Sequence, residues 1–351
     1  MYKLVIEPTG DVVDVAEGQT MLDACLRAGV WLPHACGHGL CGTCKVEVLE
    51  GAVEHTGASP FALMDFERDE GRTLACVARL ESDTVIEADI EEDADAISTP
   101  VRDFTATVAE VRQLTADIIG IWLDLPGDGM TFQAGQYVNL EVPGIEGGRS
   151  FSIASPPSQR NRIELHVRLV PDGKATTWLH AHAAPGLALR LTGPYGRFFV
   201  RHSAGLPKIF LAGGSGLSSP QSMILDLLER GEERPVVLIH GARTANDLYH
   251  GDLFRELAGR HSNFRYVPAI SGGDDGTVAD ARSGFVHEVA ESLFDGRFHG
   301  HQAYLCGPPP MIDACVTALM RGRLFEQFIF TEKFLTPADA AQARSPLFRK
   351  V

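Results

Sequence analysis

The sequence lacks any long apolar run. No stretch approaches the roughly 18 residues that a membrane-spanning helix needs, and the first residues show no basic segment followed by an apolar core. We therefore expect neither a membrane span nor an export signal, and we expect a cytoplasmic location. Internal repeats and low-complexity tracts are also absent. With 351 residues, 44% of them hydrophobic and 22% charged, the chain is expected to be a globular protein of two or three domains.

Cysteines are few in the whole chain, and basic residues are few in its first segment. Seven cysteines make an odd count, and without an export signal they indicate reduced thiols or metal ligands, not a disulfide framework. Residues 1–98 contain only 6 Lys and Arg against 20 Asp and Glu, whereas residues 99–351 contain 25 against 26. The net charge of −15 therefore lies almost entirely in the first segment. This disfavours nucleic acid or an anionic membrane as its partner and favours a protein with a basic docking patch; the alternative is that the acidity serves solubility alone.

The hydrophobic pattern divides the chain into three segments. In residues 1–98, YKLVI and DVVDV predict a hairpin around Pro8-Thr9-Gly10, and Thr20 is expected to cap a short helix that ends near Gly29. The acidic run EEDADAISTP is expected to link this segment to the next. Residues 99–203 hold short strand-like stretches separated by Gly and Pro, which predict a small antiparallel barrel. In residues 204–351 strand-like and helical stretches alternate, which predicts a doubly wound parallel sheet.

Three cysteines stand within nine residues in HACGHGLCGTC, which begins at His34. A structural zinc site would need a second cysteine pair, a Rieske centre would need a second histidine motif, and a thioredoxin-like pair belongs beside a βαβ unit. The spacing C-x4-C-x2-C with a distant fourth cysteine is instead that of a plant-type [2Fe–2S] cluster. The predicted metal ligands are Cys36, Cys41, Cys44 and Cys76.

A flavin site is indicated by Arg149-Ser150-Phe151-Ser152, at the start of a predicted strand. This stretch resembles the flavin motif of the ferredoxin–NADP reductase superfamily. The resemblance implies that Arg149 pairs with the flavin phosphates, that Phe151 packs along the flavin and that Ser152 donates a hydrogen bond near flavin N5. Phe151 stands where the superfamily more often has tyrosine, so the packing is kept while a phenolic hydrogen bond is lost.

Two further stretches strengthen this resemblance. His166-Val167-Arg168 resembles the second flavin-binding stretch, and Gly173-Lys174-Ala175-Thr176 resembles the phosphate loop, where N–H groups at a helix start face the pyrophosphate. With GPYG at 193–196, these matches favour FAD over FMN. The FAD-binding residues implied are Arg149, Phe151, Ser152, His166, Val167, Arg168, Gly173, Lys174, Ala175, Thr176 and Phe334.

A nucleotide site is indicated by the glycine turn GGSG at 213–216, between a predicted strand and a predicted helix, because such a turn can cradle phosphates. CGPPPM, which begins at Cys306, resembles a superfamily motif whose cysteine lies beside the nicotinamide; the alternative is a plain core cysteine. In FTEKF, Glu332 and Phe334 match the acidic and aromatic positions near the flavin, although 17 residues follow Phe334. The catalytic residues implied are Ser152, Cys306 and Glu332.

The choice between NADH and NADPH stays open at the level of single residues. An acidic residue after the second strand favours NAD, and Asp247 is available there, but Arg243 could instead contact a 2′-phosphate. The NAD-binding residues implied are Gly213, Gly214, Ser215, Gly216, Arg243, Asp247, Cys306, Gly307 and Pro308.

The whole chain resembles the reductase components of bacterial multicomponent phenol hydroxylases. The resemblance rests on SPFALMDFERDE, AGQYVNL, GGSGLSSPQSMILDLLERG, YLCGPPPMIDA and MRGRLFE. It implies a β-grasp ferredoxin domain over 1–98, an FAD-binding β-barrel over 99–203 and an NAD-binding α/β domain over 204–351. It also implies NADH as electron donor, FAD and one [2Fe–2S] cluster as cofactors, and a di-iron hydroxylase as electron acceptor. The alternatives are the reductase of a toluene, methane or benzoate oxygenase, and a non-enzymatic iron–sulfur carrier or sensor.

Overall fold

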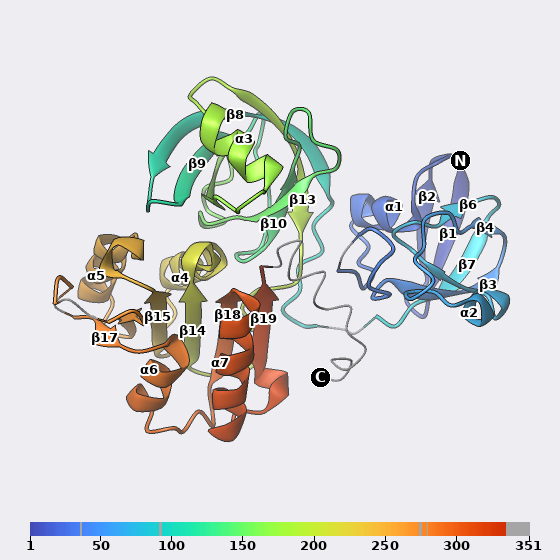
Figure 1. The fold of residues 1–351 in the computed structure, drawn as a ribbon. Helices are drawn as coiled ribbons and strands as arrows, with labels where there is room; N and C mark the ends of the chain where they lie inside the picture. The colour runs from blue at the N-terminus through green and yellow to red at the C-terminus, as the bar shows by residue number, and fades with distance from the viewer. Residues whose placement is uncertain (36, 91–92, 274–275, 279, 335–351) are drawn as a thin grey trace. The chain divides into compact units, whose positions relative to one another are not determined.

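The structure is a computed structural model that describes residues 1–351 except 36, 91–92, 274–275, 279 and 335–351 (Figure 1). The chain divides into two compact units, Met1–Arg102 and Asp103–Val351. The domain boundaries predicted at 98/99 and 203/204 stay predictions. In the part of the chain that is described, no helix has the length and hydropathy needed to cross a membrane.

The first unit is built on a mixed five-stranded sheet in the order β2-β1-β7-β3-β5, with a separate β4-β6 pair. Inward residues alternate with exposed ones, so that Leu4 and Ile6 of β1 are fully buried. The central pair β1 and β7 is parallel, whereas β1 and β2 form the predicted hairpin. The elements are β1 (Tyr2–Glu7), β2 (Asp11–Val15), α1 (Met21–Ala28), β3 (Lys45–Glu50), β4 (Val53–Glu54), α2 (Asp65–Asp69), β5 (Arg72–Leu74), β6 (Arg79–Leu80) and β7 (Thr84–Glu87).

Helix α1 confirms the sequence prediction at both ends. The Thr20 hydroxyl accepts a hydrogen bond from the Asp23 N–H at 3.3 Å, and Gly29 ends the helix in the left-handed conformation. Leu22, Cys25 and Leu26 form its buried face. The helix therefore fixes the point from which the cysteine loop begins.

The barrel of the second unit has six strands in the order β11-β10-β13-β8-β9-β12. An isolated antiparallel bridge between Ile153 and Leu165 brings the two edge strands together, so the barrel is nearly closed. Apolar side chains from all six strands fill its interior. The elements are β8 (Arg102–Gln113), β9 (Ile118–Asp124), β10 (Tyr137–Leu140), β11 (Arg149–Ser152), β12 (Arg162–Arg168), α3 (Lys174–His182) and β13 (Ala188–Tyr195).

The rest of the second unit is a parallel sheet in the order β17-β16-β15-β14-β18-β19, with its helices packed against it (Figure 1). The chain leaves β14 toward β15 on one side and reaches β18 on the other, so the strand order reverses between β14 and β18. Ligands of such sheets bind at the carboxyl ends of the strands at this reversal. The elements are β14 (Lys208–Gly213), η1 (Gly214–Leu217), α4 (Ser218–Glu229), β15 (Val236–Ala242), η2 (Ala245–Asp247), α5 (Gly251–Arg260), β16 (Phe264–Ile270), β17 (Arg282–Ser283), α6 (Val286–Leu293), β18 (Gln302–Gly307), α7 (Pro309–Arg321), η3 (Glu326–Phe328) and β19 (Ile329–Lys333).

Candidate functional site

The cysteine loop lies between α1 and β3. Cys44 and Cys76 are buried and Cys41 is exposed, whereas Cys36 lies outside the described residues. The Gly39 N–H donates a hydrogen bond to Cys76 Sγ at 3.3 Å. A hydrogen bond with the Cys76 side chain lowers the pKa of Cys44 to about 7, which favours the thiolate that iron binds.

Glycines shape the backbone of this loop. Gly37, Gly39 and Gly42 have φ angles of 69°, 73° and 77°, a region that other residues rarely adopt. A Cβ on Gly39 would come within 2.7 Å of the Gly57 carbonyl oxygen. The buried thiols and the N–H bond to sulfur fit a [2Fe–2S] cluster held by four cysteines, so the predicted ligand set stands as a proposal.

In the second unit, one carboxylate joins the barrel to the parallel sheet. Glu332 Oε2 accepts hydrogen bonds from the hydroxyls of Ser152 at 3.1 Å and Ser219 at 2.6 Å, and from the Cys306 thiol at 3.4 Å. Part of the Glu332 residue remains accessible, but its carboxylate is enclosed by these groups, and burial raises its pKa. The structure thus brings the three predicted catalytic residues together and adds Ser219, which the sequence analysis missed.

Strand register explains why these groups meet. β18 and β19 pair in parallel with Cys306 opposite Glu332, and Phe334 N–H donates to the Gly307 carbonyl at 3.0 Å. Ser219 lies in the first turn of α4, directly after the glycine turn. Burial also raises the pKa of the Cys306 thiol, which is therefore neutral at physiological pH. Its role beside a nicotinamide remains a proposal.

The glycine turn is packed against the CGPPPM segment. A Cβ on Gly213 would lie 2.6 Å from the Met311 sulfur, and one on Gly216 would overlap the Cys306 carbonyl. A Cβ on Gly307 would come within 2.9 Å of the methyl carbon of Met311. These glycines let two loops approach at the carboxyl ends of β14 and β18, where a nucleotide fits; Ser215 and Pro308 lie in the same two loops.

The flavin motif lies on barrel edge strand β11. Arg149 is exposed, and its guanidinium donates to the carbonyls of residues 146–148, while Phe151 packs partly buried against the barrel core. Tyr137 is opposite Ser152 in the register and stacks on Tyr195, with ring centroids 5.6 Å apart. These two tyrosines form a stacked aromatic pair beside Ser152 that the sequence analysis did not identify. An aromatic pair of this kind suits contact with a planar flavin ring.

The predicted phosphate loop precedes α3. Gly173 is the N-cap residue, and Lys174, Ala175 and Thr176 form the first turn, where N–H groups have no partner within the helix. The Thr176 hydroxyl accepts a hydrogen bond from the Val170 N–H and donates one to the Gly173 carbonyl, both at 3.1 Å. The hydroxyl therefore holds the loop in shape, and the backbone N–H groups are the ones that fit an anion.

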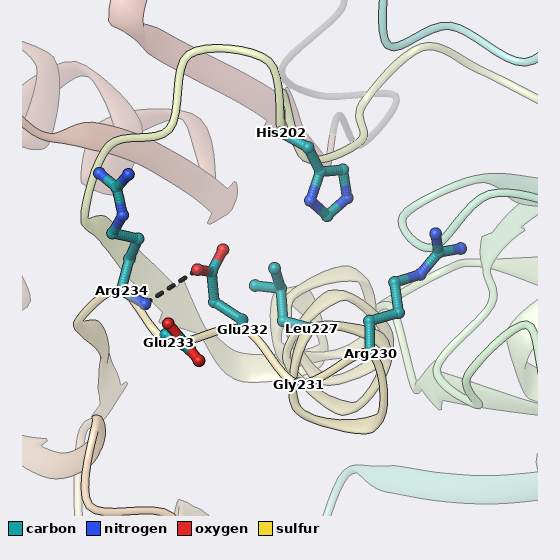
Figure 2. A pocket seen from close by; sticks show the side chains of 7 residues that line it. All are labelled: His202, Leu227, Arg230, Gly231, Glu232, Glu233 and Arg234. Carbon is teal, nitrogen blue, oxygen red and sulfur yellow. Dashed lines mark hydrogen bonds between the residues drawn. The ribbon is translucent and has the colours of Figure 1, made fainter.

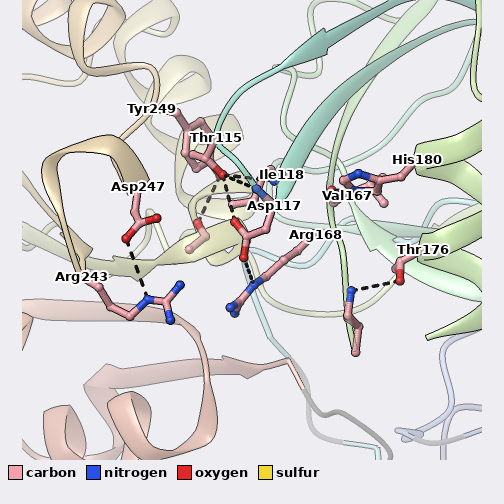
Figure 3. A network of polar contacts seen from close by, with 12 residues as sticks. Thr115, Asp117, Ile118, Val167, Arg168, Thr176, His180, Arg243, Asp247 and Tyr249 are labelled. Atoms are coloured by element: carbon pink, nitrogen blue, oxygen red, sulfur yellow. Dashed lines mark hydrogen bonds and ion pairs between the residues drawn. The ribbon is translucent and has the colours of Figure 1, made fainter. Parts of the chain in front are cut away.

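On β12, the predicted FAD-binding residues point in different directions. Val167 lies in the barrel core, whereas His166 is buried against Tyr249. Arg168 forms an ion pair with Asp117 at 2.9 Å, and its guanidinium lies 3.9 Å from where a Gly214 Cβ would be (Figure 3). The side chain of Arg168 is thus positioned over the glycine turn of the nucleotide site.

A second arginine lies near the first. Arg243 is 3.9 Å from Asp247, whose carboxylate accepts hydrogen bonds from the N–H and hydroxyl of Thr244 (Figure 3). Burial raises the pKa of Asp117, but hydrogen bonds from Arg168 and Thr115, with the charges of Arg168 and Arg243, hold it below its usual range. Arg168 beside the glycine turn, with the charge of Arg243 acting on the same Asp117, suits a nucleotide phosphate.

A surface hollow of about 320 Å³ lies elsewhere, beside the C-terminal end of α4 (Figure 2). Glu232 in its lining accepts hydrogen bonds from the Arg234 N–H and from the buried Lys208 ammonium. It lies at the amino end of β15, the edge opposite the glycine turn. The hollow therefore plays no part in the nucleotide site.

Three family profiles match the chain. The 2Fe-2S iron-sulfur cluster binding domain matches residues 4–81, the oxidoreductase FAD-binding domain residues 105–200 and the oxidoreductase NAD-binding domain residues 210–317. The FAD-binding range covers the barrel, and the NAD-binding range covers the parallel sheet up to α7.

Related proteins match over the full length. The chain is 56% identical to the phenol 2-monooxygenase reductase component of Pseudomonas sp. (strain CF600), covering 100% of this chain and 99% of the relative. It is 52% identical, with the same coverage, to the phenol hydroxylase P5 protein of Acinetobacter pittii (strain PHEA-2). Among solved structures, the Amycolatopsis reductase GcoB matches with a TM-score of 0.85 and 39% identity, over 95% of this chain and 99% of that one.

The profiles and the relatives agree with the geometry. A cysteine loop, a barrel with a flavin motif and a parallel sheet with a glycine turn at its strand reversal are the parts of an iron–sulfur flavoprotein oxidoreductase. The chain belongs to the family of the reductase components of multicomponent phenol hydroxylases.

Proposed function

We propose that this chain carries electrons from NADH through FAD and its [2Fe–2S] cluster to the di-iron hydroxylase of a phenol monooxygenase. The observation that carries the proposal is the meeting of Ser152, Cys306 and Glu332 where the barrel adjoins the nucleotide sheet. The names of the two relatives that match over the full length support phenol hydroxylation as the reaction served.

The cofactors and the residues divide the chemistry between them. When bound, NADH supplies two electrons as a hydride, FAD accepts both and releases them singly, and the cluster accepts one at a time. The two serine hydroxyls orient the Glu332 carboxylate, and the raised pKa lets Glu332 hold a proton at this buried point. Cys306, as a neutral thiol, would place no charge beside a nicotinamide bound there.

We propose that Arg149 and the first turn of α3 bind the FAD phosphates. An arginine fork and the N-terminal N–H groups of a helix both favour a pyrophosphate. The glycine turn would hold NADH at the strand reversal, with Arg243 and Asp247 as candidates for its ribose end; Arg168, predicted for FAD, lies over this turn and would also reach the NADH phosphates. The face of the flavin would pack on Phe151 and the stacked pair Tyr137 and Tyr195.

The acceptor would dock on the face of the first unit that holds the cysteine loop. Ser59 N–H donates to the Gly39 carbonyl, and Gly42 lies against Ala62, so the segment 57–62 packs beside the loop. Large apolar side chains are exposed here, with Leu40 at 58% and Phe61 at 79%. With the acidic excess of this unit, such a face suits a protein with an apolar contact patch and a basic rim.

We place the reaction in the cytoplasm. A thiolate-bound cluster depends on cysteines that are kept out of disulfides, as they are in a reducing compartment.

An anaerobic NADH titration tests the proposal. Purified holoprotein is titrated with NADH while flavin bleaching is followed optically and the reduced cluster by EPR, and the phenol hydroxylase component is then added. We expect both centres to be reduced and the EPR signal to be lost on transfer to the hydroxylase. Reduction of both centres without transfer to that hydroxylase would reject the partner, and failure of NADH to bleach the flavin would reject the reductase.

A further inference from the structure

A buried cluster of metal-ligating side chains lies in the second unit, and it shares His166 with the predicted second flavin-binding stretch. Glu164 Oε1 is 3.0 Å from His166 Nε2 and 3.4 Å from His250 Nε2, and the three ligand atoms all lie within 4.8 Å of one another. Glu164 and His166 are on β12 of the barrel, whereas His250 precedes α5 of the nucleotide sheet. We propose that Glu164, His166 and His250 form a binding site for a divalent transition-metal ion of the zinc type.

The spacing of the ligand atoms matches tetrahedral coordination. Ligand atoms at about 2.0–2.2 Å from a tetrahedral zinc ion lie about 3.3–3.6 Å apart. The distance of 3.4 Å between Glu164 Oε1 and His250 Nε2 lies within this range, and the distance of 3.0 Å between Glu164 Oε1 and His166 Nε2 is slightly shorter than it. Two imidazoles and one carboxylate are donors that zinc accepts, with a water in the fourth position.

Both barrel ligands are already held from behind, as in established metal sites. His166 Nδ1 is 3.1 Å from the Tyr249 hydroxyl, which is 3.2 Å from the Gly214 carbonyl. The other oxygen of Glu164 accepts a hydrogen bond from Gln221 Nε2 at 3.1 Å. Such outer contacts fix the orientation of a metal-bound histidine ring. They also determine which ring nitrogen carries the proton, so that the other nitrogen faces the metal.

The count of protons around His166 leaves room for a cation. The Gly214 carbonyl only accepts, so a Tyr249 hydroxyl that donates to it must accept from His166 Nδ1–H. In that arrangement His166 Nε2 turns a lone pair toward the Glu164 carboxylate 3.0 Å away, and a divalent cation between them would bind both groups.

His250 completes the site and provides its entrance. Its Nε2 atom is buried and faces Glu164 Oε1 at 3.4 Å, without a hydrogen bond of ordinary geometry to any residue that the structure describes. The residue has a φ of 56°, uncommon for a non-glycine, so the backbone holds it in this position at some cost. About 19% of its side chain is exposed, which gives an ion a route from solvent.

The proposed ion would connect three parts of the unit. It would join β12 to the segment before α5 and, through His166 and Tyr249, would fix the carbonyl of Gly214 in the glycine turn. Its expected effect is therefore greater thermal stability of the second unit.

Zinc uptake by the holoprotein tests the proposal. Protein carrying FAD and the cluster is dialysed against zinc chloride, and zinc and iron are measured in the same samples by mass spectrometry. We expect one zinc per wild-type chain with unchanged iron, and a melting temperature raised by zinc. His250→Gln and Glu164→Gln should lose the zinc, and Tyr249→Phe, which keeps all three ligands, should bind it about tenfold more weakly.

His299→Gln, at an exposed histidine on the loop before β18, is the matched control and should bind zinc as the wild type does. Equal zinc in the wild type and His250→Gln would overturn the proposal, as would wild-type protein that takes up none. Zinc uptake accompanied by iron loss would place the ion at the cysteine loop and would also overturn it.

Discussion

The cysteine loop and the nucleotide turn both use glycine, but for different physical reasons. Gly37 has a φ of 69°, and among the described residues beyond its chain neighbours no atom lies within 4 Å of the place that a Cβ would take, so its backbone conformation is what requires glycine. Gly216 has an ordinary backbone, but a side chain there would overlap the Cys306 carbonyl. The first loop therefore needs glycine to bend, and the second needs it to bring two strands of the sheet together.

The largest expected effect comes from removing a cluster ligand. Cys76→Ser should abolish the cluster and NADH-dependent reduction of cytochrome c, because a hydroxyl does not replace a thiolate on iron. NADH-dependent reduction of ferricyanide should persist through FAD, since it needs only the second unit. Iron content and both activities are measured.

Cys25→Ala is the matched control. Cys25 is buried in the core of the same unit, and burial raises the pKa of its thiol to about 12, so it stays protonated. Loss of both activities in Cys76→Ser with FAD still bound would contradict the division between the two units.

The second effect tests close approach at the nucleotide turn. Gly216→Ala should push the turn away from β18 and lower kcat/KM for NADH by about 100-fold, because a misplacement of about 1 Å has such effects on oriented reactants. Overpacking should also cost about 3 kcal/mol of unfolding free energy. Steady-state ferricyanide assays measure kcat/KM, and denaturant melts measure the free energy of unfolding. Wild-type kinetics in the variant would show that the two loops can move apart without affecting NADH binding or turnover.

The third effect concerns the carboxyl group of Glu332, which is enclosed on the nucleotide side. The raised pKa of Glu332 means that the folded state keeps a proton that the unfolded state has lost above its pKa of about 4.3. Stability should therefore fall as pH rises from the unfolded pKa to the folded pKa, by about 1.4 kcal/mol for each pH unit between them. Glu332→Gln carries no ionisable group, so its melting temperature should fall less between pH 5 and pH 8, and parallel profiles would contradict the assignment.

The smallest effect is expected at Gly37. Gly37→Ala forces a side chain into the left-handed region and should cost about 1 kcal/mol, with no steric clash. Cluster retention during thermal melts should decrease slightly, while ferricyanide reduction should match the wild type. A fall in NADH turnover like that of Gly216→Ala would erase the contrast between the two loops.

Local patterns in the sequence predicted the features that depend on local chemistry. Cysteine spacing indicated the four predicted cluster ligands, Thr20 and Gly29 marked the ends of α1, and the strand-like stretches indicated the barrel and the sheet. Contacts between residues far apart in the sequence were missed. Ser219 meets Glu332 across 113 positions, and Glu164 meets His250 across 86, so neither contact is visible in any short window.

Side-chain direction was also beyond the sequence. Tyr137 and Tyr195 stack because the register of their two strands places them opposite each other. In the sequence, AGQY and GPYG each indicate only a strand end or a turn. His166, Val167 and Arg168 form one motif in the sequence, but they point into the buried cluster, the barrel core and the glycine turn. Only the three-dimensional arrangement assigns them to separate tasks.

The pairing of β19 with β18 has a consequence for how this family can change over time. Cys306 faces Glu332 only in one register, and a slip by one residue would turn the carboxylate to the other face of the sheet. Insertions between α7 and η3 would have to leave Leu324 in place, because its side chain is buried in the core of the sheet. A single deletion inside β19 would abolish NADH oxidation while leaving the first unit able to hold its iron.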